Sequence, residues 1–396
     1  MKTPALRLSA LLLSALLLSA LLFQAACTVT AEPNVPLKAM PEPGKRWLLV
    51  GQDWDALTGY SGSNCCPMPG GVTTYLNFYA LRDANNQVFG GLGWDNEEQG
   101  VQAFADWGGG QTNAYITSQQ YPGSLLSLGL SLDEGNLADG LAQIDRGDFD
   151  AEIDKLGRFI AQHPSPVLLR IGYEFDGSWN LGYANQERYK AAFRRIAIGV
   201  RAQADNVDIV WQGSSSPADE VIDGGFQAVD GWYPGNDVVD WVGLSWFLPP
   251  EQQGFGGSSS QRALADELLT FAAARNKPVM IAESAPQGFD LRELTRANIG
   301  PVIDGPAAKA NHTLSAEQIW QLWYQPFFDY IAEHQAQIRA VAYINVRWDD
   351  QGLWAPPYAS GYWGDSRVEA QPEILKRWLA EIDQPNWQHA QVSLAQ

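Results

Sequence analysis

The sequence predicts an α/β protein built as a single (β/α)8 TIM barrel. Eight short apolar runs follow one another along the chain, and amphipathic helical stretches separate most of them. Most of these runs are continuous rather than alternating, which is typical of strands that are buried on both faces. The chain has 396 residues, and barrels of this type reach that length as one domain.

The order of these segments predicts the elements of the barrel. The expected strands are Trp47–Val50, Thr74–Tyr79, Leu125–Leu130, Val167–Ile171, Val207–Trp211, Trp241–Trp246, Val279–Ala282 and Val341–Val346. The expected helices are Phe149–His163, Gln186–Ala204, Gln261–Asn276, Ala316–His334 and Glu373–Ile382. The Gly- and Trp-rich segment Val88–Gln120 is expected to form long loops around the second and third strands.

Composition excludes several classes of function. Lys and Arg number 26 against 45 Asp and Glu, a net charge of −19, so the chain lacks the basic surface that holds a nucleic acid. None of the four His residues follows a predicted strand, which argues against a His-based zinc site and a Ser-His-Asp triad. No glycine-rich phosphate loop follows a strand either. We therefore expect no cofactor and no metal, although the acidic segment Trp94–Glu98 is either an exposed loop or a calcium site.

The first 27 residues are typical of an export signal. Lys2 and Arg7 precede an apolar run that is too short to span a membrane. The sequence FQAAC, ending at Cys27, favours a lipoprotein signal with lipidation of that cysteine, and plain cleavage near Ala25 is the alternative. Residues 28–44 are expected to form a Pro-rich tether and residues 45–396 the folded domain. The protein is then an outer-membrane lipoprotein, periplasmic or at the cell surface, or a secreted protein. It contacts a membrane through the lipid alone, and we expect a monomer.

Two further cysteines are adjacent in the chain. Cys65 and Cys66 lie in a loop rich in Pro and Gly. In an exported protein they can form a disulfide, and two half-buried thiols are the alternative.

Two of the predicted strands are followed by a glutamate. Glu174 follows the fourth apolar run and Glu283 ends the seventh. In a TIM barrel the active site lies at the carboxyl ends of the strands, so these side chains can face each other across its mouth. A pair of carboxylates beside a cavity is what cleavage of a glycosidic bond requires.

Three segments resemble glycoside hydrolase family 26. They are RIGYEFDGSWN at 170–180, WYPGNDVVDWVGLSW at 232–246 and PVMIAE at 278–283. The resemblance implies a retaining barrel enzyme in which Glu174 is the acid/base and Glu283 the nucleophile, with Arg170 supporting the site from inside the barrel.

Two positions depart from the pattern of that family. Its mannanases usually have His before the acid/base, where this chain has Tyr173, and a Tyr on the sixth strand, where this chain has Trp246. The reaction type is therefore better indicated than the substrate. Tyr173, Arg170 and the Trp246 indole are candidate hydrogen-bond donors to Glu283.

Aromatic and amide side chains near the predicted strand ends are candidates for binding sugar rings, with core or loop packing as the alternative. They are Trp179, Trp246, Asn345, Trp348, Trp354 and Trp363. Gln52, Asp53, Trp211 and Gln212 are weaker candidates of the same kind.

These observations predict an exported retaining endo-β-glycanase that acts on a plant or algal polysaccharide, with β-1,3-xylan favoured over β-mannan. A sulfated algal or bacterial polysaccharide is the alternative substrate, for which Arg347 and Arg367 are the basic residues near the mouth. A non-catalytic glycan-binding lipoprotein is the alternative from another class, and the presence of both Glu174 and Glu283 argues against it.

Overall fold

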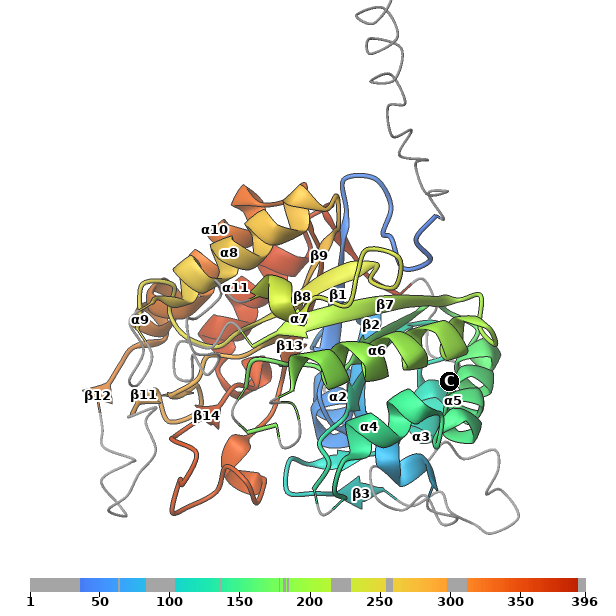
Figure 1. The fold of residues 1–396 in the computed structure, drawn as a ribbon. Coiled ribbons are helices and arrows are strands. Elements are labelled where there is room, and N and C mark those ends of the chain that lie inside the picture. The colour runs from blue at the N-terminus through green and yellow to red at the C-terminus, as the bar shows by residue number, and fades with distance from the viewer. Residues whose placement is uncertain are drawn as a thin grey trace, which may run out of the picture. The chain divides into compact units, whose positions relative to one another are not determined.

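The structure is a computed structural model that describes residues 36–62, 65–82, 104–135, 137–177, 179–180, 183, 185–214, 229–253, 259–297 and 312–390. Residues 37–396 form one compact unit (Figure 1). The predicted export signal with Cys27 and the acidic segment Trp94–Glu98 lie outside the described residues.

Eight parallel strands close into a barrel, as predicted. Neighbouring strands pair in chain order, and the last strand pairs with the first. In chain order they are β1 (Arg46–Gly51), β2 (Gly71–Asn77), β5 (Leu125–Ser131), β6 (Val167–Ile171), β7 (Val207–Gly213), β8 (Trp241–Trp246), β9 (Val279–Ser284) and β13 (Ile338–Ile344). A further short strand, β15 (Trp387–Gln388), pairs with the start of β1.

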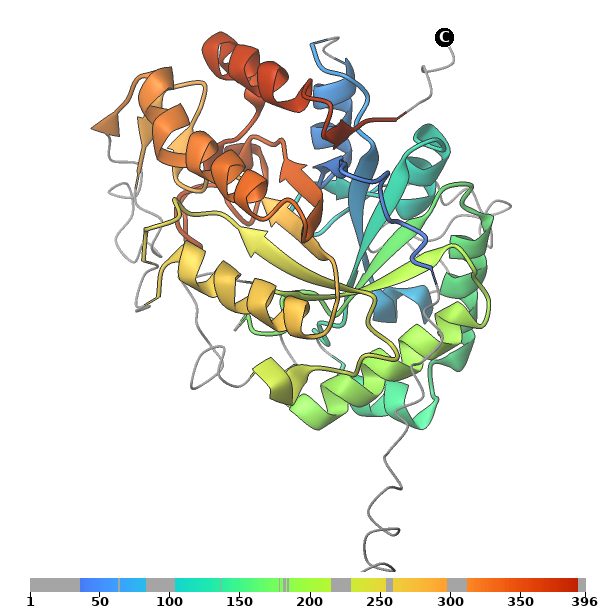
Figure 2. The ribbon, with the colours of Figure 1, turned by 90° about the horizontal axis from the view of Figure 1, so that it is seen from above.

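Helices surround these strands (Figure 2). They are α2 (Trp54–Gly62), α3 (Ala114–Gln120), α4 (Gly140–Arg146), α5 (Asp150–Gln162), α6 (Gln186–Arg201), α7 (Val229–Trp232), α8 (Gln261–Ala274), α9 (Ala316–Ile319), α10 (Gln325–Glu333) and α11 (Pro372–Ile382). Single turns are η1 (Phe78–Arg82), η7 (Trp348–Asp350) and η8 (Val368–Ala370), and the π-turn η6 (Trp320–Tyr324) joins α9 to α10. None of the helices in the described residues is long and apolar enough to cross a membrane.

Further short strands lie in the loops. They are β3 (Ala105–Asp106) with β4 (Gln111–Thr112), and a sheet of β12 (His312–Thr313), β11 (Thr295–Arg296), β10 (Phe289–Asp290) and β14 (Gly364–Asp365). The prediction of loop throughout Val88–Gln120 is wrong at its end, because Ala114–Gln120 is helical. Asn113 caps this helix by accepting a hydrogen bond from the Ile116 amide, and only two large apolar side chains follow it, too few for a helical period.

The barrel has an outer and an inner set of side chains. Alternate residues of each strand point outward onto the helices, as Leu126 and Leu128 of β5 do. At the amino end of the barrel the inward side chains are apolar: Leu49, Leu125, Leu168, Val210, Trp241, Met280, Ala282, Ala340 and Ala342. Toward the carboxyl end the inward positions become polar or glycine, with Arg170, Gln212 and Ser245 all fully buried. This change of chemistry along the barrel axis places the reactive groups at one end.

Part of the predicted tether belongs to the fold. The backbone N–H groups of Lys38 and Ala39 both donate to the Asp208 carboxylate at the start of β7, each at 2.9 Å. The Trp47 indole donates to the Ala39 carbonyl, and the Ala39 side chain packs into the apolar amino end of the barrel. Within the predicted Pro-rich tether of residues 28–44, the segment from Leu37 onward is therefore held against the barrel.

Candidate active site

Glu174 follows β6 in an unusual backbone conformation. Its φ is 51°, in the left-handed region that costs a non-glycine residue roughly 1–2 kcal/mol. Two groups hold its carbonyl oxygen in this turn: the Asn180 side-chain amide at 2.6 Å and the Gly177 backbone amide at 2.9 Å. The loop that follows β6 therefore holds the turn from which this carboxyl group is presented.

Glu283 is the penultimate residue of β9, and an irregularity of the sheet sets its position. The pairing of β8 with β9 shifts register between Leu244 and Ser245, so that Ser245 lies opposite Glu283. The Glu283 side chain is 7% exposed and Glu174 is 8% exposed. The two glutamates thus come from the fourth and seventh strands of the barrel, as the sequence predicts.

Arg170 is a buried cation that contacts Glu283 directly. Its guanidinium donates to Glu283 Oε1 at 2.7 Å, to Gln212 Oε1 at 2.9 Å and to Thr73 Oγ1 at 3.2 Å. Gly129 leaves room for it, because a Cβ there would lie 2.7 Å from the Arg170 guanidinium. A buried guanidinium needs such a partner, since removing one member of a buried ion pair leaves an uncompensated charge. Arg170 and Glu283 therefore form a buried ion pair inside the barrel.

Gln212 and Ser245 connect the two glutamates. The Gln212 amide nitrogen lies 3.3 Å from Glu283 Oε1 and 3.2 Å from Ser245 Oγ. The Ser245 hydroxyl donates to Glu174 Oε1 at 2.7 Å. The carboxyl groups on opposite strands therefore share one hydrogen-bond network inside the barrel.

Burial raises the pKa of Glu174 well above its ordinary value, and the nearby Glu283 and Asp176 raise it further. Hydrogen bonds from Ser245 and from the Trp179 indole act in the opposite direction, because they stabilise the ionised carboxylate. Glu174 is consequently suited to carry a proton, while Glu283 forms an ion pair with Arg170. Two carboxyl groups with such different surroundings can act as an acid and a nucleophile.

Trp179 lies beside Glu174 and remains accessible. Its indole N–H donates to Glu174 Oε2 at 3.0 Å, and its side chain is 44% exposed. Gly177 allows this arrangement, because a Cβ there would lie 2.3 Å from the indole ring. An exposed indole next to the reactive carboxyl group is placed to contact a bound sugar ring.

Tyr173 packs beside the ion pair. Its ring meets the buried Tyr75 ring edge-on at 5.3 Å, and the Arg170 guanidinium lies 5.3 Å from its centre. Burial raises the pKa of Tyr173, as does the charge of Glu283. Tyr173 therefore forms a neutral aromatic surface beside the ion pair.

Trp246 was predicted to contact sugar, and the structure contradicts this. Its side chain is fully buried on the outside of the barrel, where it packs against Phe327 and Tyr330 of α10. Side chains alternate along a strand, so the inward residue at this end of β8 is the preceding Ser245. Trp246 is a core residue, and Ser245 occupies the place that the prediction gave to it.

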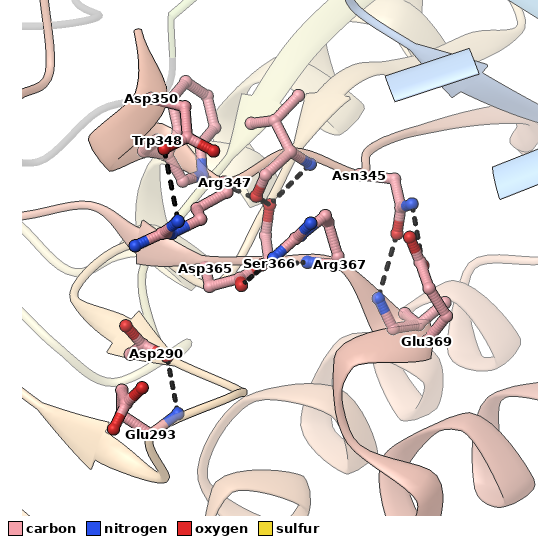
Figure 3. Close-up of polar contacts among 12 residues, drawn as sticks. Asp290, Glu293, Asn345, Arg347, Trp348, Asp350, Asp365, Ser366, Arg367 and Glu369 are labelled. Carbon is pink, nitrogen blue, oxygen red and sulfur yellow. Dashed lines mark hydrogen bonds and ion pairs between the residues drawn. The ribbon is translucent and has the colours of Figure 1, made fainter. Parts of the chain in front are cut away.

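Asn345 is also a structural residue. Its amide nitrogen donates to Glu369 at 2.9 Å, and its oxygen accepts from the Val368 amide at 2.9 Å (Figure 3). Both ends of the side chain are therefore occupied by the segment before α11. The alternation of β13 explains the outcome, because Ala342 and Ile344 point into the barrel and Asn345 follows one residue out of phase.

Three tryptophans form a cluster at the rim of the mouth. The rings of Trp348 and Trp363 are 4.5 Å apart, those of Trp354 and Trp363 are 4.9 Å apart, and Phe247 meets Trp363 edge-on. Trp348 is buried, and its indole donates to Ser366, which makes it a packing residue rather than a sugar ligand. Trp363 is nearly buried as well, and Trp354 keeps part of its surface exposed.

A hollow of about 250 Å³ opens between the ends of β1 and β13. Among the described residues its lining includes the carboxylates Asp53, Asp55, Asp106, Asp350 and Glu369 and the cations Arg347 and Arg367. Arg367 is paired with Asp365 at 2.6 Å, and Arg347 lies 3.3 Å from Asp350 (Figure 3). Burial raises the pKa of Asp53 to about 7, and the nearby Asp55 adds to the effect. The hollow is thus dominated by negative charge.

The remaining residues that the sequence predicts as candidates lie away from the two glutamates or are packed in the fold. Gln52 is buried at the end of β1, and Trp211 stacks on Phe175 on the outside of the barrel at 4.5 Å. Cys65 and Cys66 are half-buried thiols that no disulfide joins, and their sulfur atoms lie 2.6 Å apart. No group of three or more His, Cys, Asp or Glu side chains able to hold a metal ion occurs in the part of the chain that the structure describes.

Ser245, Thr73 and Tyr75 are the site residues that sequence reasoning missed. All three lie at inward positions of strands, where a short polar or aromatic residue interrupts an apolar run. Strict alternation along each strand would have found them once the direction of a single neighbour was known.

Two curated proteins resemble this chain over most of its length. The β-1,3-xylanase TXYA of a Vibrio species is 34% identical over 357 residues, which are 88% of this chain and 67% of the relative. A β-1,3-xylanase of an Alcaligenes species is 32% identical over 357 residues, 88% of this chain and 66% of the relative. This chain therefore spans about two thirds of the length of each relative.

Among solved structures, the catalytic domain of a Bacillus sp. JAMB-750 GH26 endo-β-1,4-mannanase has the same fold. Its TM-score is 0.53 at 14% identity, over 88% of this chain and 89% of that one. No family model matches the chain. The barrel, the strand-end glutamates and the identity to the Vibrio enzyme together show that the chain is a glycoside hydrolase belonging to the same family as the β-1,3-xylanase TXYA.

Proposed function

We propose that this chain is an exported endo-β-glycanase of glycoside hydrolase family 26 that cleaves β-1,3-xylan with retention of configuration. The observation that carries the proposal is the asymmetry of the two buried glutamates. Glu283 lies 2.7 Å from the Arg170 guanidinium, whereas burial and neighbouring anions raise the pKa of Glu174. This is the division of roles that a retaining glycosidase requires.

The proposed reaction proceeds in two displacements. In the first, a Glu283 carboxylate oxygen forms a bond to the anomeric carbon while Glu174 gives its proton to the departing glycosidic oxygen. In the second, water attacks the glycosyl-enzyme ester as the Glu174 carboxylate takes a proton from that water. The bond to Glu283 breaks, and both glutamates return to their starting forms.

Two observations support a neutral xylan as the substrate. The two relatives described above are named β-1,3-xylanases. The hollow beside the mouth carries more carboxylates than cations, and its two arginines are already paired with Asp365 and Asp350. Negative charge repels sulfate groups and uronic acids, so this hollow disfavours the sulfated polysaccharide that the sequence left as an alternative. β-Mannan stays the second candidate.

Export and lipid anchoring are part of the proposal. Residues 1–27 support it through their basic start, their apolar run and the cysteine at position 27. Incorporation of labelled palmitate into the full chain expressed in a bacterium tests it, with Cys27→Ser as the control. Label in both proteins, or in neither, contradicts lipidation at Cys27.

The activity test compares hydrolysis of β-1,3-xylan, β-mannan, mixed-linkage glucan and a sulfated galactan. Wild type is run beside Glu174→Gln and Glu283→Gln, with the exposed Glu187→Gln as the matched control. We expect cleavage of β-1,3-xylan, losses of several orders of magnitude in the first two variants, and no change in the control. The anomeric form of the first product, observed by NMR, reports retention or inversion.

The same panel addresses the alternative from another class. A glycan-binding protein without activity would bind an oligosaccharide tightly and leave it intact in the wild type. Retained activity in Glu283→Gln would contradict the proposed nucleophile, and an inverted first product would contradict the two-step mechanism.

A further inference from the structure

Three buried side chains form a hydrogen-bond chain with a fixed direction behind Glu174. Arg170 Nη1 lies 2.9 Å from Gln212 Oε1, Gln212 Nε2 lies 3.2 Å from Ser245 Oγ, and Ser245 Oγ lies 2.7 Å from Glu174 Oε1. Arg170, Gln212 and Ser245 are all completely buried, and they come from three successive strands of the barrel.

The direction follows from the chemistry of the first member. A guanidinium can only donate hydrogen bonds, so the Gln212 group facing Arg170 is the amide oxygen. The amide nitrogen of Gln212 then faces Ser245 and donates to its oxygen. The Ser245 hydroxyl keeps one hydrogen to donate, and the acceptor that the structure gives it is Glu174 Oε1 at 2.7 Å.

The other oxygen of Glu174 has a different kind of partner. Glu174 Oε2 accepts from the Trp179 indole at 3.0 Å, and the indole is also only a donor. Both carboxylate oxygens therefore face donors, and a proton resides more readily on the oxygen whose donor can withdraw. Ser245 is locked in place by Gln212, whereas the Trp179 side chain is 44% exposed on a loop.

We infer that Ser245 and Gln212 are positioning residues that reserve Glu174 Oε1 as an acceptor, so that the catalytic proton is carried by Oε2, on the side of Trp179. The inference rests on the proposed glycosidase function for its catalytic meaning. The hydrogen-bond arrangement itself is a property of the free protein and can be measured without a substrate.

A consequence concerns the pH at which Glu174 loses its proton. A hydroxyl that donates to a carboxylate stabilises the ionised form, so loss of the Ser245 hydroxyl raises the pKa of Glu174. The other charged or titratable groups around Glu174 are Glu283 from β9, Asp176 and Tyr173 from the segment after β6, and Arg170 behind Glu283. Ser245 makes no printed hydrogen bond to any of these groups, and it reaches Glu283 only through the Gln212 amide nitrogen, which lies 3.2 Å from Ser245 Oγ and 3.3 Å from Glu283 Oε1.

The test titrates the Glu174 carboxyl group by infrared difference spectroscopy, with Glu174→Gln supplying the spectrum to subtract. Ser245→Ala is expected to move this titration upward by about one to two pH units, the size of a hydrogen bond to a charged group. Ser245→Cys keeps a weaker donor and is expected to give a smaller shift. The matched control is Ser127→Ala, because Ser127 is equally buried in the barrel and its hydroxyl has no partner among the described residues.

The alkaline limb of kcat/KM on the glycan is measured in parallel and is expected to move with the infrared titration. An unchanged infrared titration in a folded Ser245→Ala protein, or an equal shift in Ser127→Ala, overturns the inference. A shifted titration in a protein that cleaves no glycan supports the hydrogen-bond arrangement and contradicts the proposed function instead, so the two failures are distinguishable.

Discussion

Replacing Arg170 by methionine should be among the most destabilising single changes in this barrel. The substitution keeps an unbranched apolar stem but removes the only cation that contacts Glu283 in the described site. It leaves a carboxylate inside the barrel without its ion pair and deprives Gln212 and Thr73 of a donor. Breaking a buried pair by removing one partner costs about 3–5 kcal/mol of unfolding free energy.

A matched variant separates burial from bond geometry. Arg195 pairs with Asp150 at 2.7 and 2.8 Å, distances as short as that between Arg170 and Glu283, but this pair lies at the surface. Exposed pairs contribute about 0–1 kcal/mol, so Arg195→Met should have little effect. The two ion pairs have equally short distances, so a larger loss of unfolding free energy in Arg170→Met than in Arg195→Met would show that burial determines the size of the loss.

The assay is urea unfolding at neutral pH, followed by tryptophan fluorescence. Most domains have about 5–15 kcal/mol of unfolding free energy, so Arg170→Lys serves as the milder variant where methionine prevents folding. The double variant Arg170→Met with Glu283→Gln should recover part of the loss, because its buried carboxylate is gone. A loss below about 1 kcal/mol in Arg170→Met, or no recovery in the double variant, refutes the reasoning about the uncompensated charge.

Three further predictions concern other parts of the molecule. Trp246→Ala should lower the unfolding free energy, measured in urea, by about 3–5 kcal/mol and leave KM unchanged in the folded protein. Trp179→Ala should instead raise KM with little loss of stability. The opposite pattern would contradict our assignment of the two indoles. Because burial raises the pKa of Asp53 from 3.8 to about 7, the unfolded state releases this proton first as pH rises. Stability should therefore fall between about pH 4 and 7, by up to about 4 kcal/mol, and Asp53→Asn should flatten that slope in denaturation series; an unchanged slope would exclude Asp53 as its source. Finally, Cys65 and Cys66 should form a disulfide in protein exported to an oxidising compartment. Thiol titration of the unfolded Cys27→Ser protein should then find no free thiol until a reductant is added, and free thiols without reductant would contradict this.

The barrel could be predicted because most of its strands are short apolar runs that can be recognised in the sequence. Runs such as Val167–Ile171 and Trp241–Trp246 are apolar apart from one polar residue each, and the structure has strands over the same residues. Helices with a weak apolar period were harder. Ala114–Gln120 depends on a single Asn cap, and Gly140–Arg146 is a short helix that begins with glycine. Local pattern is insufficient where a few contacts with the barrel decide the conformation.

The candidate site likewise contains residues that the sequence predicts and residues that it does not. Glu174 and Glu283 could be found because each follows a buried run, and strand ends converge in a barrel. The choice between Ser245 and Trp246 depends on which face of β8 points inward, and a run that is apolar on both faces does not reveal it. The register shift between Leu244 and Ser245 is likewise a property of two strands together and has no local signal.

The clasp between Asp208 and the backbone of Lys38 and Ala39 has a mechanical consequence. It ties the entering chain to the amino end of the barrel, whereas Glu174 follows β6 and Glu283 lies near the carboxyl end of β9. A force applied through residues before Leu37 is therefore transmitted to β7 at the amino end of the barrel. It does not act on the loops at the carboxyl end, where the two glutamates lie.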